Sequence, residues 1–146
     1  MKKEMLLEIL SYIKDAYVDL NEPKYFFLER GNEEADKLIN EVSRFFGLIE
    51  DTDFNEDVSR GFIISKDKTS IVLRVSLVGP YYFLLQLSGA FDEFKEVESK
   101  IDNLAGIFHF RKIAIEDLTV ILPVKFAEED YSIYQALFSY SGFAPF

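Results

Sequence analysis

The segment spanning residues 61–88 constrains the fold most, because it contains three β-type runs separated by two short turns. The runs are residues 61–65, 70–78 and 81–88. They are rich in β-branched, aromatic and leucine side chains, which favour strands. The intervening residues, 66–69 and Gly79-Pro80, are typical of tight turns. Because turns this short connect antiparallel neighbours, the sequence predicts a three-stranded antiparallel meander.

The middle run of the meander alternates clearly between two faces. Ile71, Leu73, Val75 and Leu77 occupy one face, and residues 72, 74, 76 and 78 occupy the other. We expect the first face to pack on the core. The second face is also partly apolar, through Val72, Val78, Tyr82 and Leu84, so we expect another element to cover part of it.

Helices and shorter strands are predicted on both sides of the meander. Apolar residues recur at steps of three and four in residues 4–20, 33–46, 91–104 and 131–140, which predicts four amphipathic helices. Asn32 is a suitable N-cap for the second helix, and Glu128-Glu129-Asp130 would form the first turn of the last. Further strands are expected at residues 25–28, 107–113 and 118–122.

This order of elements is not the βαβα alternation of a doubly wound sheet. We therefore expect an α+β fold in which an antiparallel sheet of about five strands, with the meander at its centre, is packed by helices. The helices would be an N-terminal pair, a middle helix and a C-terminal helix. A length of 146 residues predicts one globular domain, residues 1–146.

Composition excludes several classes of function. The chain has no cysteine, which removes disulfides, thiolate zinc sites and cysteine nucleophiles and is typical of a cytoplasmic protein. Its formal net charge of −10 disfavours nucleic-acid and anionic-membrane partners. No apolar run approaches the length of about 20 residues that a membrane-spanning helix needs.

No catalytic, metal or cofactor motif stands out. His109 is the single histidine, and it lies in a predicted strand with no local partner that would make it a general base. The spacing Asp51-x-Asp53-x-Asn55-x-Asp57 is similar to the start of an EF-hand calcium loop. The match then fails, because Glu56 occupies the position of the required glycine and Phe62 that of the required glutamate. We therefore predict no catalytic residue, no metal site and no cofactor.

The acidity is concentrated in one part of the chain. Residues 31–60 contain nine acids and three bases, whereas residues 61–90 contain one acid and three bases, with Lys66, Lys68 and Arg74 as a modest basic edge. The loop 50–57 holds five carboxylates in eight residues and is expected to be exposed. The predicted partner-binding residues are Glu33, Glu34, Asp36, Glu50, Asp51, Asp53, Phe54, Glu56 and Asp57. Charge would accelerate encounter with a basic protein, and Phe54 would supply an aromatic anchor.

In overall build and charge, through the Glu50–Asp57 stretch and the helix start Glu33-Glu34-Ala35-Asp36, the chain resembles the small acidic immunity proteins that neutralise basic nuclease toxins in bacteria. The resemblance implies a cytoplasmic inhibitor that blocks the substrate-binding face of a toxin domain.

Other readings of the sequence stay open. One is a small hydrolase or ligand-binding enzyme that uses carboxylates in a pocket between sheet and helices. Another is a structural protein that homo-oligomerises through an uncovered sheet face or through the tail with Phe143 and Phe146. The sequence leaves the oligomeric state undetermined, and the acidity is equally compatible with a role in solubility alone.

Overall fold

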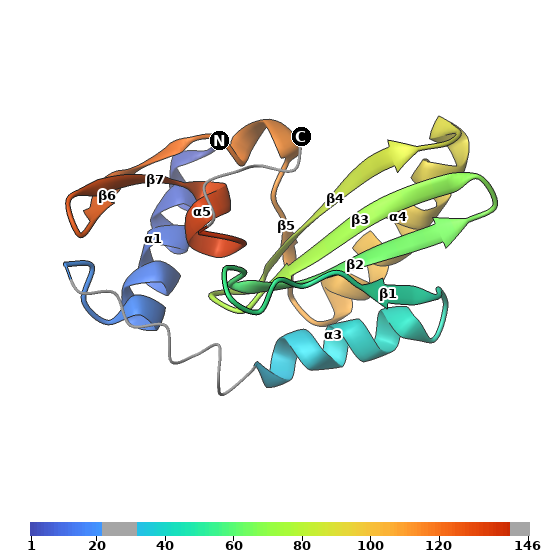
Figure 1. The fold of residues 1–146 in the computed structure, drawn as a ribbon, viewed down its shortest axis with the longest axis horizontal. Helices are drawn as coiled ribbons and strands as arrows, with labels where there is room; N and C mark the ends of the chain where they lie inside the picture. The colour runs from blue at the N-terminus through green and yellow to red at the C-terminus, as the bar shows by residue number, and fades with distance from the viewer. Residues whose placement is uncertain (22–31, 141–146) are drawn as a thin grey trace.

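The computed structural model describes residues 1–21 and 32–140, and a five-stranded sheet of order β1-β2-β3-β4-β5 occupies the right-hand half in Figure 1. The strands of this sheet are β1 Leu48–Glu50, β2 Ser59–Lys66, β3 Thr69–Ser76, β4 Tyr81–Ser88 and β5 Arg111–Lys112. A smaller sheet pairs β6 Ile121–Phe126 with β7 Glu129–Ser132. The helices are α1 Lys3–Tyr17, α3 Glu33–Ser43, α4 Phe91–Ile107 and α5 Ile133–Leu137, with a 3-10 turn, η1, at Ile115–Asp117.

The predicted meander is confirmed. Strands β2, β3 and β4 pair antiparallel in chain order, and Lys66 pairs with Thr69 across the first turn. Asp67 closes that turn in the left-handed region with φ 54°. Strand β1 extends the sheet antiparallel to β2, whereas β5 lies parallel to β4. The α+β class is therefore confirmed, with a mixed sheet.

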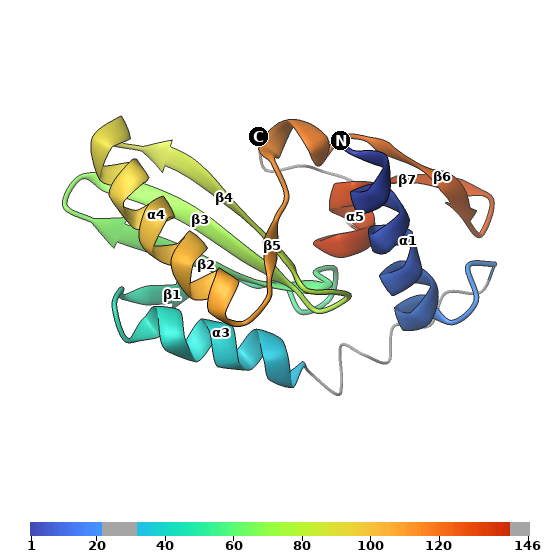
Figure 2. The same ribbon diagram turned by 180° about the vertical axis from the view of Figure 1, so that it is seen from behind.

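One face of the sheet packs on α3 and α4; in Figure 2, α4 crosses in front of the strands and α3 lies below them. Leu73 of β3, Leu38 of α3 and Ile101 of α4 are fully buried in this core. Tyr82 and Leu84 of β4 belong to the same core, so their assignment to the second face was wrong. The register explains this, because Leu84 pairs with Leu73 and paired residues point to the same side.

The second face is covered at one end by α1, α5 and the β6–β7 hairpin, as the sequence led us to expect. Phe83 of β4 meets Phe138 edge to face, with ring centroids 4.8 Å apart. The hydroxyl of Tyr17 on α1 donates to the carbonyl of Ala136 at 2.8 Å and ties α1 to α5. Helices α1 and α3 therefore contribute to two different apolar clusters.

The prediction of a strand over residues 107–113 was wrong for most of that segment. Helix α4 continues to Ile107, and the chain turns out of the helix at His109, where φ is 61°; the N–H of Phe110 donates to the carbonyl of Ala105 at 2.9 Å. This helix end takes up residues 107–110 and leaves only two residues for β5. His109 is consequently an exposed residue of a helix end and not a strand residue.

The predicted C-terminal helix over residues 131–140 is also shorter than expected. Ser132 and Gln135 form a reciprocal capping box, so α5 begins at Ile133. The acids at 128–130 do not form a helical first turn, because they lie in the β6–β7 hairpin, where Ala127 and Glu128 both have positive φ.

The last predicted strand is displaced along the chain. It covers residues 121–126 in place of 118–122, and Pro123 lies where the pairing of β6 with β7 is irregular.

Two sequence predictions, the strand at residues 25–28 and the packing of Phe143 and Phe146, lie outside the described residues. Within the described part of the chain, none of the helices combines the length and apolar character that crossing a membrane requires.

Candidate functional site

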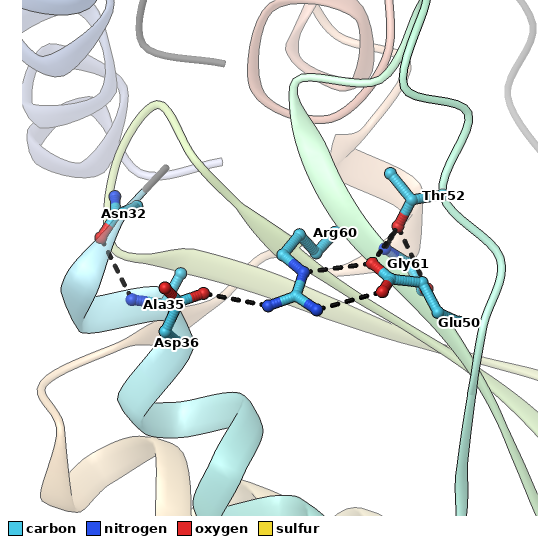
Figure 3. A network of polar contacts seen from close by, with 7 residues as sticks. All are labelled: Asn32, Ala35, Asp36, Glu50, Thr52, Arg60 and Gly61. Carbon is cyan, nitrogen blue, oxygen red and sulfur yellow. Dashed lines mark hydrogen bonds and ion pairs between the residues drawn. The ribbon is translucent and has the colours of Figure 1, made fainter. Parts of the chain in front are cut away.

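Arg60 on β2 connects the two acidic stretches that the sequence separates (Figure 3). Its Nη1 donates to Asp36 Oδ1 at 2.9 Å, while its Nε and Nη2 each donate to one oxygen of Glu50 at 3.1 Å. Thr52 Oγ1 donates to Glu50 at 2.8 Å and accepts the N–H of Gly61 at 2.9 Å. The start of α3 and the end of β1 are therefore held together through one guanidinium.

In this clamp, Arg60 pairs with two of the predicted site carboxylates. Hydrogen bonds from Arg60 outweigh partial burial and, together with the Thr52 hydroxyl, hold the pKa of Glu50 below its ordinary value. The contact with Glu50 in turn raises the pKa of Arg60. Both groups are charged at neutral pH, and bidentate pairing of this kind satisfies both partners. Arg60 therefore cancels one of the two negative charges of Asp36 and Glu50, and the three groups together retain one.

The N-terminus of α3 carries two further acids of the predicted site. Asn32 caps the helix by accepting the N–H of Ala35 at 3.1 Å, as predicted. The side chains of Glu33 and Glu34 are exposed, and Lys37 lies 3.7 Å and 3.4 Å from them. Exposed pairs of this type contribute at most about 1 kcal/mol and rearrange readily.

Asp57 is not on the surface, although the whole loop 50–57 was expected to be exposed. Only 6% of this residue is accessible, and its Oδ2 lies 2.8 Å from Arg74 Nη1. The same oxygen accepts the N–H of Asp53 at 2.8 Å. Gly61 permits this contact, because a Cβ there would lie 3.1 Å from the Arg74 guanidinium. Asp57 therefore anchors the loop from inside the protein.

Arg74 was predicted to belong to a basic edge of the first hairpin, and its contact with Asp57 shows that it does not. It is not part of a basic edge, because β3 is the central strand and the Arg74 side chain is only 12% exposed. Its role as a partner for the acidic loop was missed. The sequence did contain one indication of this role. Arg74 alternates with the core-facing residues of its strand and so lies on the same partly apolar second face as Val72.

The rest of the loop is ordered by main-chain contacts. The carbonyl of Asp53 accepts the N–H groups of Glu56 and Asp57 at 3.1 Å and 2.7 Å. Tyr140 donates its N–H to the carbonyl of Glu56 at 3.2 Å and its hydroxyl to the carbonyl of Asn55. The loop is thereby attached to the residues that follow α5.

Phe54 is the exposed centre of this loop. It is 75% accessible, the largest exposed fraction among the large apolar residues described. Asp51, Asp53 and Glu56, which flank Phe54 in the sequence, are also exposed. Within residues 1–21 and 32–140, no lysine or arginine forms an ion pair with any of these three carboxylates. We call Asp51, Asp53, Phe54 and Glu56 the acidic tip.

Other candidate chemistry is sparse in the part of the chain that the structure describes. No group of three His, Cys, Asp or Glu residues there is placed to hold a metal ion. Lys66 forms an ion pair with Glu96 of α4 at 3.0 Å and so ties the first hairpin to that helix.

Comparisons with protein-family models, with curated proteins and with solved structures give no match to this chain.

Proposed function

We propose that this chain is a protein-binding module that receives a basic partner protein on the acidic tip. The observation that carries the proposal is the exposure of Phe54 among three carboxylates without a cationic partner in the described structure. An aromatic ring that is mostly in water gains by burial against a partner, and such residues dominate the energy of interfaces. The surrounding carboxylates would accelerate encounter with a basic surface.

The anchoring of the tip supports this proposal. Binding costs less conformational entropy when the interface is already ordered. The buried Asp57–Arg74 pair and the contacts of Tyr140 hold the loop after Phe54. Before Phe54, the N–H of Asp53 donates to the Asp57 carboxylate. A charged loop kept only for solubility requires neither a buried ion pair beneath it nor an exposed phenylalanine at its centre.

We further propose that the partner is a toxin domain of the nuclease type and that the module inhibits it in the cytoplasm. This rests on the resemblance in build and charge to acidic immunity proteins and on the absence of cysteine. The tip would occupy the basic surface with which such a partner binds its own substrate.

Capture of partners from the native host, followed by reconstitution with the purified partner, tests the proposal. The double variant Asp51→Lys, Glu56→Lys is expected to lower the association rate about tenfold or more and to weaken its salt dependence. Phe54→Ala is expected to raise the dissociation rate, with an affinity loss of about 30-fold, which corresponds to about 2 kcal/mol. Inhibition of the partner's nucleic-acid cleavage should decline in parallel with affinity.

Asp15→Lys, Glu129→Lys provides a matched control, because it makes the same change of charge at exposed sites away from the tip. We expect this control to retain affinity within about threefold. The proposal fails if only copies of the chain are recovered. It also fails if the control and the tip variants weaken binding equally, since net charge would then explain the effect.

A further inference from the structure

Strand β4 has one edge that is paired for only part of its length. On one side it pairs with β3 from Tyr82 to Ser88. On the other side β5 reaches only Tyr81 and Tyr82, and the chain then leaves the sheet towards η1. The later residues of β4 therefore form a sheet edge without a neighbouring strand in the described structure.

The register shows which main-chain groups face this edge. The carbonyl of Tyr82 accepts the N–H of Ile113, so the main-chain groups of Tyr82 point away from β3. Strand residues alternate in the direction of these groups. Leu84 and Gln86 therefore direct their N–H and C=O groups towards this edge. Leu84 is only 4% accessible and Gln86 is half-buried, so an added strand must enter the space beside them to reach these groups.

A hollow of about 350 Å³ lies along this edge. Its lining residues come from three elements. They are Leu84, Leu85 and Gln86 of β4, Phe94 and Glu98 of α4, and residues 112–116, from the end of β5 onwards. Exposed apolar surface continues beyond the hollow, since Phe91 is 61% accessible and its ring centroid lies 6.5 Å from that of Phe94. The edge therefore lies in an apolar groove between a helix and a turn.

The charge at the hollow is negative. Lys112 lies 2.7 Å from Asp102 and 3.2 Å from Glu98, so its charge is compensated within the protein. Tyr82 donates to the other oxygen of Asp102 at 2.6 Å. Glu116 is exposed, and among the described residues no cation pairs with it. An occupant with a basic side chain near Glu116 would compensate this carboxylate.

Strand β4 also lacks the usual protection against pairing. Natural edge strands are commonly blocked by lysine, by proline or by being short. Residues 81–88 include no charged residue and no proline, and the strand is eight residues long. By contrast, the edge strand β1 at the other side of the sheet has three residues.

We propose that the groove beside β4 binds an extended segment of a partner protein, which adds a strand at Leu84 and Gln86 and alternates apolar with basic residues. Strand addition of this kind is a common mode of peptide recognition. A second copy of β4 fits poorly, because α4 and residues 112–116 border β4 in each copy and would meet when two such edges approach. The site does not depend on the acidic tip, which follows β1 at the opposite edge.

A synthetic hexapeptide of alternating valine and lysine is a suitable probe. Labelled peptide would be titrated by fluorescence anisotropy, and its site would be mapped from backbone amide shifts. We expect the largest shifts at Leu84 and Gln86. A peptide N-methylated at alternate residues cannot donate the strand hydrogen bonds, so its affinity should fall about tenfold or more.

Two protein variants complete the test. Gln86→Pro removes one N–H that faces the edge and should weaken binding about fivefold or more. Glu116→Lys should weaken it about threefold, whereas Asp15→Lys should leave it unchanged.

The inference is overturned if the N-methylated peptide binds equally well. It is also overturned if the shifts cluster at Asp51 to Glu56, which would indicate charge attraction to the acidic tip. A third outcome would also overturn it: if the protein forms concentration-dependent dimers without peptide, and the amide shifts again occur at Leu84, the occupant of the groove is a second copy of the chain.

Discussion

The buried ion pair between Asp57 and Arg74 makes the sharpest prediction about this protein. Replacing Asp57 by alanine removes a 2.8 Å ion pair and the acceptor of the Asp53 N–H. It also removes the carboxylate partner of Arg74, whose side chain is only 12% exposed and whose Nε already has no hydrogen-bond partner. Losing one member of a buried pair typically costs about 3–5 kcal/mol, so we expect a loss of stability of that size.

A double-mutant cycle with Asp57→Ala and Arg74→Met separates the pair from its surroundings. Because the double variant leaves no uncompensated buried charge, we expect it to be less destabilised than the sum of the single variants, with a coupling of about 2 kcal/mol or more. Urea unfolding followed by circular dichroism measures these free energies. Amide exchange at Asp53 would report whether the acidic tip loosens in Asp57→Ala.

Small and additive losses of stability in the two single variants would contradict a buried, coupled Asp57–Arg74 pair. If each single variant costs less than about 1 kcal/mol and the two add, the pair behaves as an exposed salt bridge. The tip would then lack the buried anchor on which its preorganisation depends. A strong response to 1 M salt would lead to the same conclusion, because buried pairs are screened weakly.

Two further predictions concern a glycine and a carboxylate. Gly89→Ala should cost about 1–3 kcal/mol in thermal or urea unfolding from backbone strain, because its φ is 101°, and a steric clash adds to this cost, because a Cβ would lie 2.4 Å from the Cα of Thr69. Gly106→Ala, where a Cβ meets nothing within 4 Å in helix α4, should instead stabilise by about 0.5–1 kcal/mol, and equal effects of the two changes would contradict this reasoning. The folded-state pKa of Glu50 lies below its ordinary value of 4.5, so the stability that it contributes is present above that pH and is lost as the pH falls through the folded-state pKa. Stability measured from about pH 6 to pH 3 should therefore fall more steeply for the natural chain than for Glu50→Gln, and parallel curves would exclude the linkage.

Local patterns were sufficient for much of the fold. The meander follows from alternation and two tight turns, and α1, α3 and α4 follow from apolar residues at helical spacing, because both signals come from residues close together in the chain. The errors in the bounds of helices and strands cluster at the end of α4 and after it. There the capping box of Ser132 and the helix end at His109 redirect the chain within a few residues, and positive φ at residues such as Ala127 is not apparent from residue type.

The acidic surface shows where sequence reasoning stopped. The sequence by itself determined that residues 33–57 carry the densest negative charge, since charge depends only on residue type. Only the tertiary structure decided which of those charges remain uncompensated. Arg60 pairs with both Asp36 and Glu50 and compensates one of their two charges, and Arg74 holds Asp57 in the interior. These partners are 10 to 24 residues apart, and no local period connects them, so the division into clamp, anchor and exposed tip arises only when β1, β2, β3 and α3 pack together.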